Sequence, residues 1–589
     1  MSDTHKAHSK RVLVLGEDAR SFLTVIRSLA ESGYEVHAVC YDQQSPAFKS
    51  RYLTSLHSYN YQAYSQQQWL DCVLALIERY RFHLVIPCDE RAIYPLWSQR
   101  NRIANSTKLA ISNSLSLDIL FDKWKTKQAA IECNVAVAKG SIHDLLTVNY
   151  QKIANGFGEQ FVIKPLQSFN EDSLSSRQNV KIINSEKEYD IFTKSLSKNN
   201  STFLIEEFFE GKGEGLSVFA VEGTIHAAFA HIRVAEPKQG GGSSYRKSIP
   251  LDPDLLIATE KLCQDTKLTG VAMFEYRRNE KSRRWILVEV NARFWGSLPL
   301  AVASGINFPK LYADYLCDGY LPKTPLLSYD EDHYARQLLA DLYRIKGDAE
   351  YDNEHYSTRT SLINLIKNLM SFSRIFIGKE TLDSFSWQDK QPFFRELKTI
   401  SEQFSWALIK KVPLLITIKR NSVQKQLMKL FKLKTNRRVL FICYGNIMRS
   451  SFAEHYLSQK LIANGIASKD QIASYGFHKN ENRQSPQNAQ FAAKQLNVSL
   501  SEHRSKSLYQ SDIEDSDILI YFDESHRLKL MSYYCTNHLF SAADLLDKRY
   551  SNECEISDPY NGSSDEVSVC YKKVINAVEQ LLLIKKGAR

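Results

Sequence analysis

One loop of the sequence carries the residue types of a phosphate-binding site with a cysteine nucleophile. Cys443 ends a short apolar run, and Arg449 and Ser450 follow it in the pattern C-x5-R-S before a helix-like stretch. Five residues after a strand can curl so that their backbone N–H groups converge on one point, towards which the next helix directs its N-terminus. An oxyanion such as phosphate would be held there by these amides and by a bidentate contact to the guanidinium of Arg449.

The same electrostatic field would make the thiol of Cys443 a nucleophile. Positive charge and converging amides favour the thiolate over the thiol, and Ser450 can donate a further hydrogen bond to the sulfur. Gly445 and Asn446 tolerate the left-handed backbone that such a loop needs. The thiolate could then attack phosphorus and form a phosphocysteine. The other members of this predicted loop are Tyr444, Gly445, Asn446, Ile447, Met448 and Ser450.

A proton donor for the leaving group follows later in the chain. Asp558 begins the sequence DPY in a predicted loop, and Tyr560 ends it. A departing alkoxide or phenoxide needs a proton, so Asp558 is the candidate general acid and afterwards the base for the hydrolytic water. Tyr560 could wall the mouth of the site. The alternative for Cys443 is a buried structural cysteine followed by a helix-capping serine.

A second group of residues has the chemistry of a magnesium–nucleotide site. Glu275 is followed fourteen residues later by Glu289, Asn291 and Arg293 in the pattern E-x-N-x-R. Strand alternation places the last three on one face. The carboxylates and the carboxamide would supply hard oxygen ligands for Mg²⁺, or for Mn²⁺ in its place. Arg293 could neutralise a transferring phosphoryl group. Taken alone, the pattern also fits an ion pair on a surface strand.

Upstream polar residues could complete this site. Lys164 ends an apolar strand and could reach a phosphate as a point charge. Glu206 follows the apolar run FLI, where a strand could offer backbone groups to an adenine edge. The glycine loop 240–242, with Ser243 and Ser244, could present N–H groups to phosphate or close over a substrate.

On these motifs, residues 10–325 resemble an ATP-grasp enzyme of the carboxylate–amine ligase type. The matching stretches are DKWKTKQAA, FVIKP, LIEEFFEGKGEG, the RV…GGGSSYR loop and FEYRR…LVEVNARFWGS. The resemblance implies Mg-ATP, phosphorylation of a substrate carboxylate, and attack of an amine on the acyl phosphate. It further implies nucleotide binding by Lys164, Glu206 and Glu214, metal binding by Glu275, Glu289 and Asn291, and a phosphate-side role for Arg293.

Residues 437–589 resemble the low-molecular-weight protein tyrosine phosphatases. Supporting stretches are IASYGF, LNVSLSEHRSKSL and DILIYFDESH, besides the C-x5-R-S and DPY motifs. The resemblance implies a small four-stranded parallel sheet and hydrolysis of a phosphomonoester on a protein tyrosine or a small metabolite. Members of the family usually carry a second cysteine where Met448 stands and a proline where Ser451 stands. Because Cys443 lacks that partner thiol, we expect it to oxidise irreversibly more easily.

Two other interpretations stay open on the sequence. In one, a module binds nucleotide or phosphoprotein and regulates the other module without catalysing a reaction. In the other, the C-terminal part is an arsenate reductase, which shares this fold and loop but needs a resolving cysteine pair nearby. Cys535, Cys554 and Cys570 are widely spaced, and the DPY motif would be superfluous in a reductase, so the phosphatase is the favoured interpretation.

The elements that must position these residues follow from hydrophobic periodicity. Residues 11–115 alternate buried strands with amphipathic helices, which predicts a parallel, Rossmann-like sheet. Gly16 is the only glycine of the first turn, which argues against a G-x-G-x-x-G dinucleotide site. A single helix over 117–134, followed by strands that are mostly hairpin-linked, predicts an α+β region. The last 150 residues return to a βαβ rhythm.

We therefore predict an α/β multidomain chain, because 589 residues are too many for one core. Its four parts are a Rossmann-like pre-ATP-grasp domain over 1–115, an α+β ATP-grasp domain over 116–325, a helical extension with a basic linker over 326–436, and a phosphatase-like domain over 437–589. Within the extension, the sequence SFSWQDKQPFF at 384–394 is predicted to be a docking loop.

The composition is that of a cytoplasmic protein. Hydrophobic residues make up 43% and charged residues 24% of the chain, and the ten cysteines form no C-x-x-C pair. This usage argues against a structural zinc site or a disulfide framework and fits a reducing compartment. The N-terminus has no apolar signal region, and no apolar stretch is long enough to span a bilayer. The expected partners are a small-molecule carboxylate, an amine, and a phosphorylated protein or metabolite, and not nucleic acid.

The formal charge of +10 is concentrated in one segment. Residues 404–442 contain ten Lys and Arg and no acidic residue, with Val423, Leu427, Leu430 and Phe431 at helical spacing. A basic amphipathic helix can lie on an anionic membrane surface or bind an acidic partner. The favoured interpretation is a solvated interdomain helix whose apolar stripe packs on a neighbouring domain.

Overall fold

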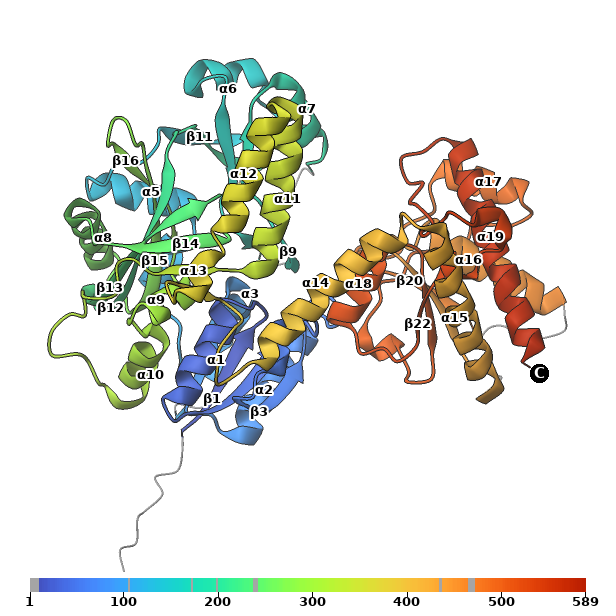
Figure 1. Cartoon of the computed structure of the whole chain (residues 1–589), viewed down its shortest axis with the longest axis horizontal. Helices are drawn as coiled ribbons and strands as arrows, with labels where there is room; N and C mark the ends of the chain where they lie inside the picture. The colour runs from blue at the N-terminus through green and yellow to red at the C-terminus, as the bar shows by residue number, and fades with distance from the viewer. Residues whose placement is uncertain are drawn as a thin grey trace, which may run out of the picture. The chain divides into compact units, whose positions relative to one another are not determined.

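The computed structural model describes residues 10–103, 106–170, 173–196, 200–236, 242–433, 437–463 and 472–588. These residues form two compact units (Figure 1). The first unit comprises Met1–Cys40, Ser45–Ser58 and Leu70–Glu396, and the second comprises Tyr41–Gln44, Tyr59–Trp69 and Leu397–Arg589. The boundaries of the four domains drawn from the sequence stay predictions.

A parallel five-stranded sheet begins the first unit. Its strands are β1 (Arg11–Gly16), β2 (Glu35–Cys40), β3 (Leu53–Ser58), β4 (Leu84–Pro87) and β5 (Lys108–Leu109), in the order β3-β2-β1-β4-β5. Every neighbouring pair is parallel. The helices of this part are α1 (Ser21–Glu31), α2 (Gln66–Tyr80) and α3 (Glu90–Ser98). The predicted parallel sheet is therefore confirmed, and α3 starts directly after the carboxyl end of β4.

Two antiparallel-rich sheets follow in the same unit. The four-stranded sheet has the order β10-β7-β11-β6, with β6 (Gly140–Asp144), β7 (Phe161–Pro165), β10 (Lys181–Ile183) and β11 (Thr202–Glu207). The seven-stranded sheet has the order β16-β15-β12-β13-β14-β17-β18, with β12 (Lys212–Val221), β13 (Thr224–Ala235), β14 (Tyr245–Ile249), β15 (Gly270–Arg278), β16 (Trp285–Asn291), β17 (Tyr334–Arg336) and β18 (Glu380–Leu382). A separate hairpin pairs β8 (Phe169–Asn170) with β9 (Ser173–Arg177).

One helix predicted for this α+β part is divided into two in the structure. The helices of this part are α4 (Ser114–Leu120), α5 (Lys123–Glu132), α6 (Tyr150–Phe157), α7 (Glu186–Lys194), α8 (Pro253–Asp265), α9 (Leu298–Ala303) and α10 (Phe308–Asp318). The single helix expected over 117–134 is wrong. Asp122 interrupts it, because its carboxylate caps α5 by accepting the N–H groups of Trp124 at 2.8 Å and Lys125 at 3.0 Å.

The segment after residue 325 belongs partly to the seven-stranded sheet. β17 pairs antiparallel with β14, and β18 pairs parallel with β17. Arg336 of β17 is fully buried and forms ion pairs with Asp341 and Glu380. The helices α11 (Leu338–His355), α12 (Thr358–Met370) and α13 (Ser373–Phe376) connect the two strands. The extension therefore supplies two strands to the sheet as well as helices.

The predicted docking loop is confirmed by the contacts of one buried carboxylate. Asp389 accepts hydrogen bonds from Arg27 Nε at 3.0 Å, Ser50 Oγ at 2.8 Å and the N–H of Arg51 at 2.9 Å. Because an unpaired buried carboxylate is costly, these three donors hold the loop against the five-stranded part of the first unit.

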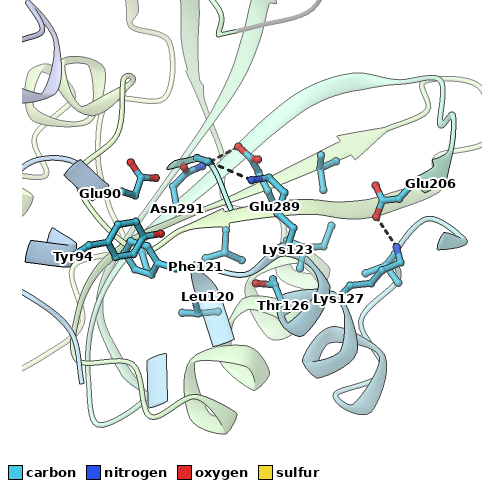
Figure 2. Close-up of a pocket in the computed structure, with 16 residues that line it drawn as sticks. Glu90, Tyr94, Leu120, Phe121, Lys123, Thr126, Lys127, Glu206, Glu289 and Asn291 are labelled. Carbon is cyan, nitrogen blue, oxygen red and sulfur yellow. Dashed lines mark hydrogen bonds and ion pairs between the residues drawn. The ribbon is translucent and has the colours of Figure 1, made fainter. Parts of the chain in front are cut away.

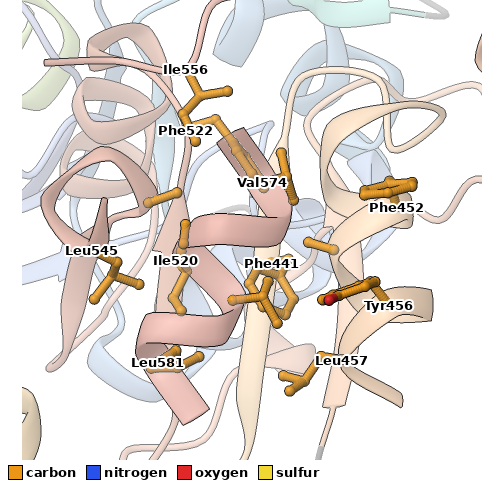
Figure 3. Packing of buried hydrophobic residues seen from close by; sticks show 14 of the residues in the cluster. Phe441, Phe452, Tyr456, Leu457, Ile520, Phe522, Leu545, Ile556, Val574 and Leu581 are labelled. Carbon is orange, nitrogen blue, oxygen red and sulfur yellow. The ribbon is translucent and has the colours of Figure 1, made fainter. Parts of the chain in front are cut away.

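The second unit is built on four parallel strands, as the sequence predicts. They are β19 (Val439–Cys443), β20 (Ile472–Gly476), β21 (Ile518–Tyr521) and β22 (Leu539–Ser541), in the order β20-β19-β21-β22. Its helices are α15 (Pro413–Leu433), α16 (Arg449–Ala463), α17 (Gln487–Gln495), α18 (Glu524–Tyr533) and α19 (Ser564–Gly587), while α14 (Gln391–Ile409) runs across the boundary at residue 396. Strand residues such as Phe441 and Ile520 pack against α16 and α19 (Figure 3). Phe452 stacks on Tyr571 with ring centroids 3.8 Å apart.

The apolar stripe of the basic segment packs on this core. Leu427 and Phe431 of α15 are fully buried in it, and Val423 and Leu430 pack against it. Arg420 of the same face donates to four carbonyl oxygens between residues 546 and 553. The favoured interpretation of the stripe as a packing surface is confirmed. No described helix combines the length and apolar character that crossing a bilayer requires.

Two candidate active sites

The cysteine loop of the second unit has the predicted arrangement of strand, loop and helix. Cys443 is the last residue of β19, and Arg449 is the first residue of α16. The Sγ atom of Cys443 lies 3.0 Å from Ser450 Oγ and accepts the N–H of Asn446 at 3.2 Å. The sulfur therefore lies at the N-terminus of α16, where hydrogen-bond donors and the helix dipole favour negative charge.

Asn446 fixes the shape of this loop. It has φ of +52°, while Gly445 is not left-handed, so the asparagine alone uses the conformation expected of both. Its Nδ2 donates to Ser450 Oγ at 2.9 Å and to Ser474 Oγ at 2.7 Å. Its carbonyl oxygen accepts from His503 Nε2 at 2.7 Å. These contacts hold the loop before any substrate arrives, which lowers the cost of reorganisation.

Three loop-supporting residues lie in stretches quoted for the phosphatase resemblance but were assigned no role from the sequence. Ser474 on β20 and His503 in the loop after α17 form hydrogen bonds with Asn446. No motif spacing in the sequence connects either residue with Cys443. Gly476 ends β20, and a Cβ atom there would lie 2.8 Å from Asn446 N and from Tyr444 O. Only glycine allows the loop to approach β20 so closely. The glycine at the end of IASYG was the one signal that could have shown this.

Arg449 and Asp558 come together as predicted. The guanidinium of Arg449 is buried and donates to Asp523 at 2.7 Å, to Asp558 at 2.7 Å and to the Ile556 carbonyl at 2.9 Å. Burial alone lowers the pKa of Arg449, but Cys443 and the two aspartates outweigh it and raise the pKa above its usual value. The Asp558 side chain is 46% exposed, so it can exchange protons with water and with a bound substrate.

A cavity of about 800 Å³ joins these groups. Its floor is the loop from Cys443 to Arg449, and Asp558 lies at its edge. Tyr444 and Tyr560 line it with exposed fractions of 48% and 55%, so aromatic rings wall its mouth. The cavity therefore brings together the thiol of Cys443, the guanidinium of Arg449 and the carboxyl group of Asp558.

The carboxylates of the first unit also gather at one place. Glu275 on β15 pairs in register with Glu289 on β16, and Asn291 follows on the same strand. Asn291 Nδ2 lies 3.3 Å from Glu289 Oε1, and Arg293 donates to Asn291 Oδ1 at 3.0 Å. The expectation that Arg293 lies on the strand is wrong, since β16 ends at Asn291. The arginine reaches the same group from the turn that follows.

One acidic partner of this group was missed on the sequence. Glu90, the first residue of α3, is buried and forms an ion pair with Arg293 Nε at 3.0 Å. It lines one cavity with Glu289 and Asn291 (Figure 2). The signal was its place directly after β4, because ligand sites of parallel sheets form at the carboxyl ends of strands.

Two lysines share one buried glutamate on the other side of this cavity. Lys164 lies 2.6 Å and Lys127 lies 2.7 Å from the carboxylate of Glu206 (Figure 2 shows the Lys127 pair). Burial alone raises the pKa of Glu206, but the two lysines outweigh it and hold the pKa below its usual value. Lys127 and Lys123, which also lines the cavity, were quoted in the motif DKWKTKQAA but not assigned a role.

Not every predicted residue belongs to this group. Glu206, Glu289 and Asn291 line the cavity, and Lys164 and Arg293 contact them. Glu214 is not among the lining residues and instead accepts from Arg278 Nε at 2.9 Å.

In the described part of the glycine loop, Ser243 and Ser244 direct their hydroxyl groups to protein partners, and His231 of β13 is buried. Gly240 and Gly241 lie outside the described residues. The hydroxyl of Ser243 donates to backbone carbonyls, and that of Ser244 donates to Asp341 at 2.8 Å. His231 is buried beside Phe229, with its ring over Gly215. Burial lowers the pKa of His231 to about 3, and Arg233 and Arg246 add to the effect, so the ring is neutral.

Glu289 and Asn291 offer oxygen atoms of the kind that magnesium prefers, whereas Glu275 does not line the cavity and accepts a hydrogen bond from Arg233 Nη2 at 2.6 Å. Burial raises the pKa of Glu275, and the neighbouring Glu289 adds to the rise although Arg233 opposes it. A divalent cation beside these two carboxylates would favour their ionised forms. In the described part of the chain, no cluster of three or more His, Cys, Asp or Glu side chains could hold a metal ion. The amide of Asn291 and the phosphates of a nucleotide would therefore complete the ligand set.

Two family models match separate parts of the chain. Residues 438–586 match the model of the low molecular weight phosphotyrosine protein phosphatases, and residues 199–333 match a model described as ATP-grasp in the biosynthetic pathway with Ter operon. A low molecular weight phosphotyrosine protein phosphatase of Dictyostelium discoideum is 26% identical over 168 residues, which are 25% of this chain and 93% of the relative. A probable low molecular weight protein-tyrosine-phosphatase of Erwinia amylovora, AmsI, is 29% identical over 143 residues, which are 24% of this chain and 92% of the relative.

Solved structures resemble part of the chain at low identity. The ADP complex of an N5-carboxyaminoimidazole ribonucleotide synthetase covers 55% of this chain and 80% of its own, with 14% identity and a TM-score of 0.41. An L-amino acid ligase from Bacillus licheniformis covers 53% of this chain and 74% of its own, with 13% identity and a TM-score of 0.41.

Proposed function

We propose that this chain, which joins an ATP-grasp domain to a low molecular weight phosphotyrosine protein phosphatase domain, catalyses two reactions. The first is the ATP-dependent joining of a carboxylate to an amine, and the second is the hydrolysis of a phosphomonoester. The observation that carries the proposal is the convergence of Cys443, Arg449 and Asp558 on one cavity.

The phosphatase reaction follows from the positions of these three residues. The thiolate of Cys443 attacks phosphorus, while the loop amides and Arg449 hold the phosphoryl oxygens. Asp558 gives a proton to the leaving oxygen and then takes one from the water that cleaves the phosphocysteine. A phosphate bound between the loop and Arg449 would compete with Asp558 for the guanidinium, which would release the carboxyl group for proton transfer. The tyrosine-walled mouth favours an aromatic phosphate such as phosphotyrosine.

Substitution of the nucleophile tests this half. The variant Cys443→Ser is expected to lose p-nitrophenyl phosphate hydrolysis, since a serine hydroxyl has no comparable anionic form at neutral pH. The variant Asp558→Asn keeps the nucleophile and is expected to lose activity most strongly for substrates with poor leaving groups. If Cys443→Ser hydrolyses the substrate at the parent rate, the assignment of the nucleophile is wrong.

The ligase reaction is inferred from the cavity of the first unit. Lys164, Lys123 and Lys127 would bind phosphates of ATP, and Glu275, Glu289 and Asn291 would hold the magnesium ion, which neutralises phosphate charge. Arg293, oriented by Glu90, would face the transferred phosphoryl group. A substrate carboxylate would accept that group, and an amine would then displace it. Among the residues predicted to bind ATP, Glu214 has the weakest support, because its carboxylate already accepts a hydrogen bond from Arg278.

A screen for ADP release over pairs of small carboxylic acids and amines tests the ligase half. The expected result is ADP formation that requires both substrates and disappears in Glu289→Gln. The rival interpretation is a nucleotide-sensing module, which would bind Mg-ATP tightly in calorimetry and release no ADP with any pair. Such a result would replace the ligase with a sensor and leave the phosphatase proposal untouched.

A further inference from the structure

One peptide bond of the phosphate-binding loop connects the reactive sulfur with a residue outside the loop. The N–H of Asn446 donates to Cys443 Sγ at 3.2 Å, and the carbonyl of the same peptide belongs to Gly445. That carbonyl oxygen accepts a hydrogen bond from Arg483 Nη2 at 2.6 Å. The chain of contacts therefore runs from a guanidinium through one peptide unit to the nucleophile.

Arg483 is itself held from several directions. Its Nε donates to the Asn480 carbonyl at 2.9 Å. Its backbone N–H donates to Ser505 Oγ at 3.0 Å, and its backbone carbonyl accepts the Ser505 N–H at 3.0 Å. A planar guanidinium with its Nε and Nη2 both engaged has few rotamers left, so its charge stays next to the Gly445 carbonyl.

We infer that Arg483 is a positioning residue that acts on Cys443 through the Gly445–Asn446 peptide. A peptide whose carbonyl accepts from a cation has more positive charge on its N–H, because hydrogen bonds in a chain polarise one another. The stronger N–H donor stabilises the thiolate more than the thiol. The contact also fixes the peptide plane, so that the N–H of Asn446 stays directed at Cys443 Sγ.

This role of Arg483 requires no contact between its guanidinium and the substrate. Arg483 lines the same cavity, so a direct phosphate contact is the main rival explanation. The two roles differ in an experiment without phosphate. Alkylation of Cys443 by neutral iodoacetamide reports the thiolate population of the free enzyme, while a residue that only binds substrate changes KM.

The test compares Arg483→Met with Arg483→Lys in the full chain. The methionine removes the charge and the donors and is expected to lower kcat for p-nitrophenyl phosphate about tenfold. It should also move the midpoint of the alkylation–pH curve upwards by about half to one pH unit. The lysine keeps the charge and one donor and is expected to restore the midpoint in part. The matched control is Arg504→Met, since Arg504 is an exposed arginine of the same unit that donates to the Ser501 and His503 carbonyls and not to the loop.

Three results would overturn the inference. An unchanged alkylation midpoint with a raised KM would make Arg483 a substrate-binding residue only. A loss of kcat and of alkylation rate at every pH, with the midpoint unchanged, would make it a structural support of the loop. An equal midpoint shift in Arg504→Met would show a general effect of surface charge. The inference rests on the proposed phosphatase reaction. If Cys443→Ser loses all activity and Arg483→Met has no effect, the role of Arg483 is wrong while the phosphatase proposal stands.

Discussion

Met448 determines how the nucleophile responds to oxidants. It is buried in the loop, and its thioether cannot form a disulfide with Cys443 as a second thiol would. Cys570 is the other described cysteine that lines the cavity. Burial raises the pKa of Cys570 to about 12, so it is a protonated thiol and a slow partner for an oxidised sulfur.

We therefore predict that peroxide inactivates the phosphatase and that a thiol reductant restores less than about a tenth of the activity, because sulfenic acid proceeds to irreversible sulfinic acid. Met448→Cys should make most of the inactivation reversible by supplying the missing thiol. Phosphatase assays before and after dithiothreitol, with mass spectrometry of the oxidised peptides, measure both effects. Met448→Leu is the control for the loss of the thioether. Full recovery of the parent enzyme would contradict the prediction and make Cys570 the resolving residue.

His231 gives the first unit a dependence of stability on pH. Its pKa in the folded state is about 3, below the value of about 6.5 for an unfolded histidine. The unfolded chain therefore takes up the proton first, and the stability is fully present above pH 6.5 and lost as the pH falls towards 3. Between pH 6.5 and pH 5 this single ring should cost the folded state about 2 kcal/mol.

The variant His231→Gln, which does not titrate, should remove that part of the pH dependence. Urea unfolding at pH 7 and pH 5, with hydrogen exchange at β12 and β13 as the local probe, measures the difference. The exposed His355→Gln is the control in the same unit. An equal loss of stability on acidification in His231→Gln and in the parent would show that other groups cause it.

At the scale of elements, α15 has two different faces. Successive residues of a helix turn by about 100°, so Ile416, Arg420, Leu427 and Phe431 lie on one face, and all four are buried. By the same count, Leu414, Ile418, Lys425, Lys429 and Lys432 lie within about 60° of one another on the opposite face. All five are exposed, and Leu414 and Ile418 are exposed by 67% and 56%. This outer face combines apolar side chains with lysines and fits an anionic membrane surface.

We predict that the chain binds vesicles containing phosphatidylglycerol and does not bind pure phosphatidylcholine, and that 0.5 M salt reverses the binding. Replacing Lys425, Lys429 and Lys432 together by Glu should weaken binding by about 100-fold or more, since each lysine near an anionic surface contributes about 1 kcal/mol. Co-sedimentation measures the effect. A matched triple change to Glu at the exposed Lys494, Lys548 and Lys572 should bind like the parent or nearly so. Absence of binding at every salt concentration would remove the proposed membrane contact.

The elements also show how far sequence reasoning reaches. Hydrophobic periodicity predicted the two parallel sheets and the helical basic segment, because both depend on local pattern. It joined α4 and α5, since a capping role for Asp122 is visible only once the chain turns there. It did not predict that β17 and β18 join the seven-stranded sheet, because strands of three residues leave no periodic signal.

The candidate sites show the same limit. Motif spacing predicted Cys443, Arg449 and the carboxylates on β15 and β16, since each motif lies within or close to one element. It missed Glu90 of α3 and Ser474 of β20, which reach their sites from elements distant in the sequence. Such partners become visible only when sheet order is known.

At the scale of the whole molecule, the two cavities draw on separate parts of the chain. Residues 90–292 line the carboxylate cavity in the first unit, and residues 443–573 line the cysteine cavity in the second. Among these lining residues, none is shared, so the chemistry of either site needs no group from the other. We therefore predict that the two activities can be removed independently.

Reciprocal substitutions test this independence in the full chain. Glu289→Gln should lower ATP consumption by about 100-fold or more, because the carboxylate beside the phosphoryl group is lost. It should leave kcat/KM for p-nitrophenyl phosphate within about twofold of the parent, while Cys443→Ser should do the reverse. The conservative Glu222→Gln, at an exposed turn away from the cavity, serves as the control for a changed glutamate in the first unit. A fall of phosphatase activity in Glu289→Gln, or a phosphatase rate that depends on Mg-ATP in the parent, would instead make the first unit a regulator of the second. Coupling of that kind requires the nucleotide to bind two states of the chain with different affinity, so its size would give the free energy that links the two sites.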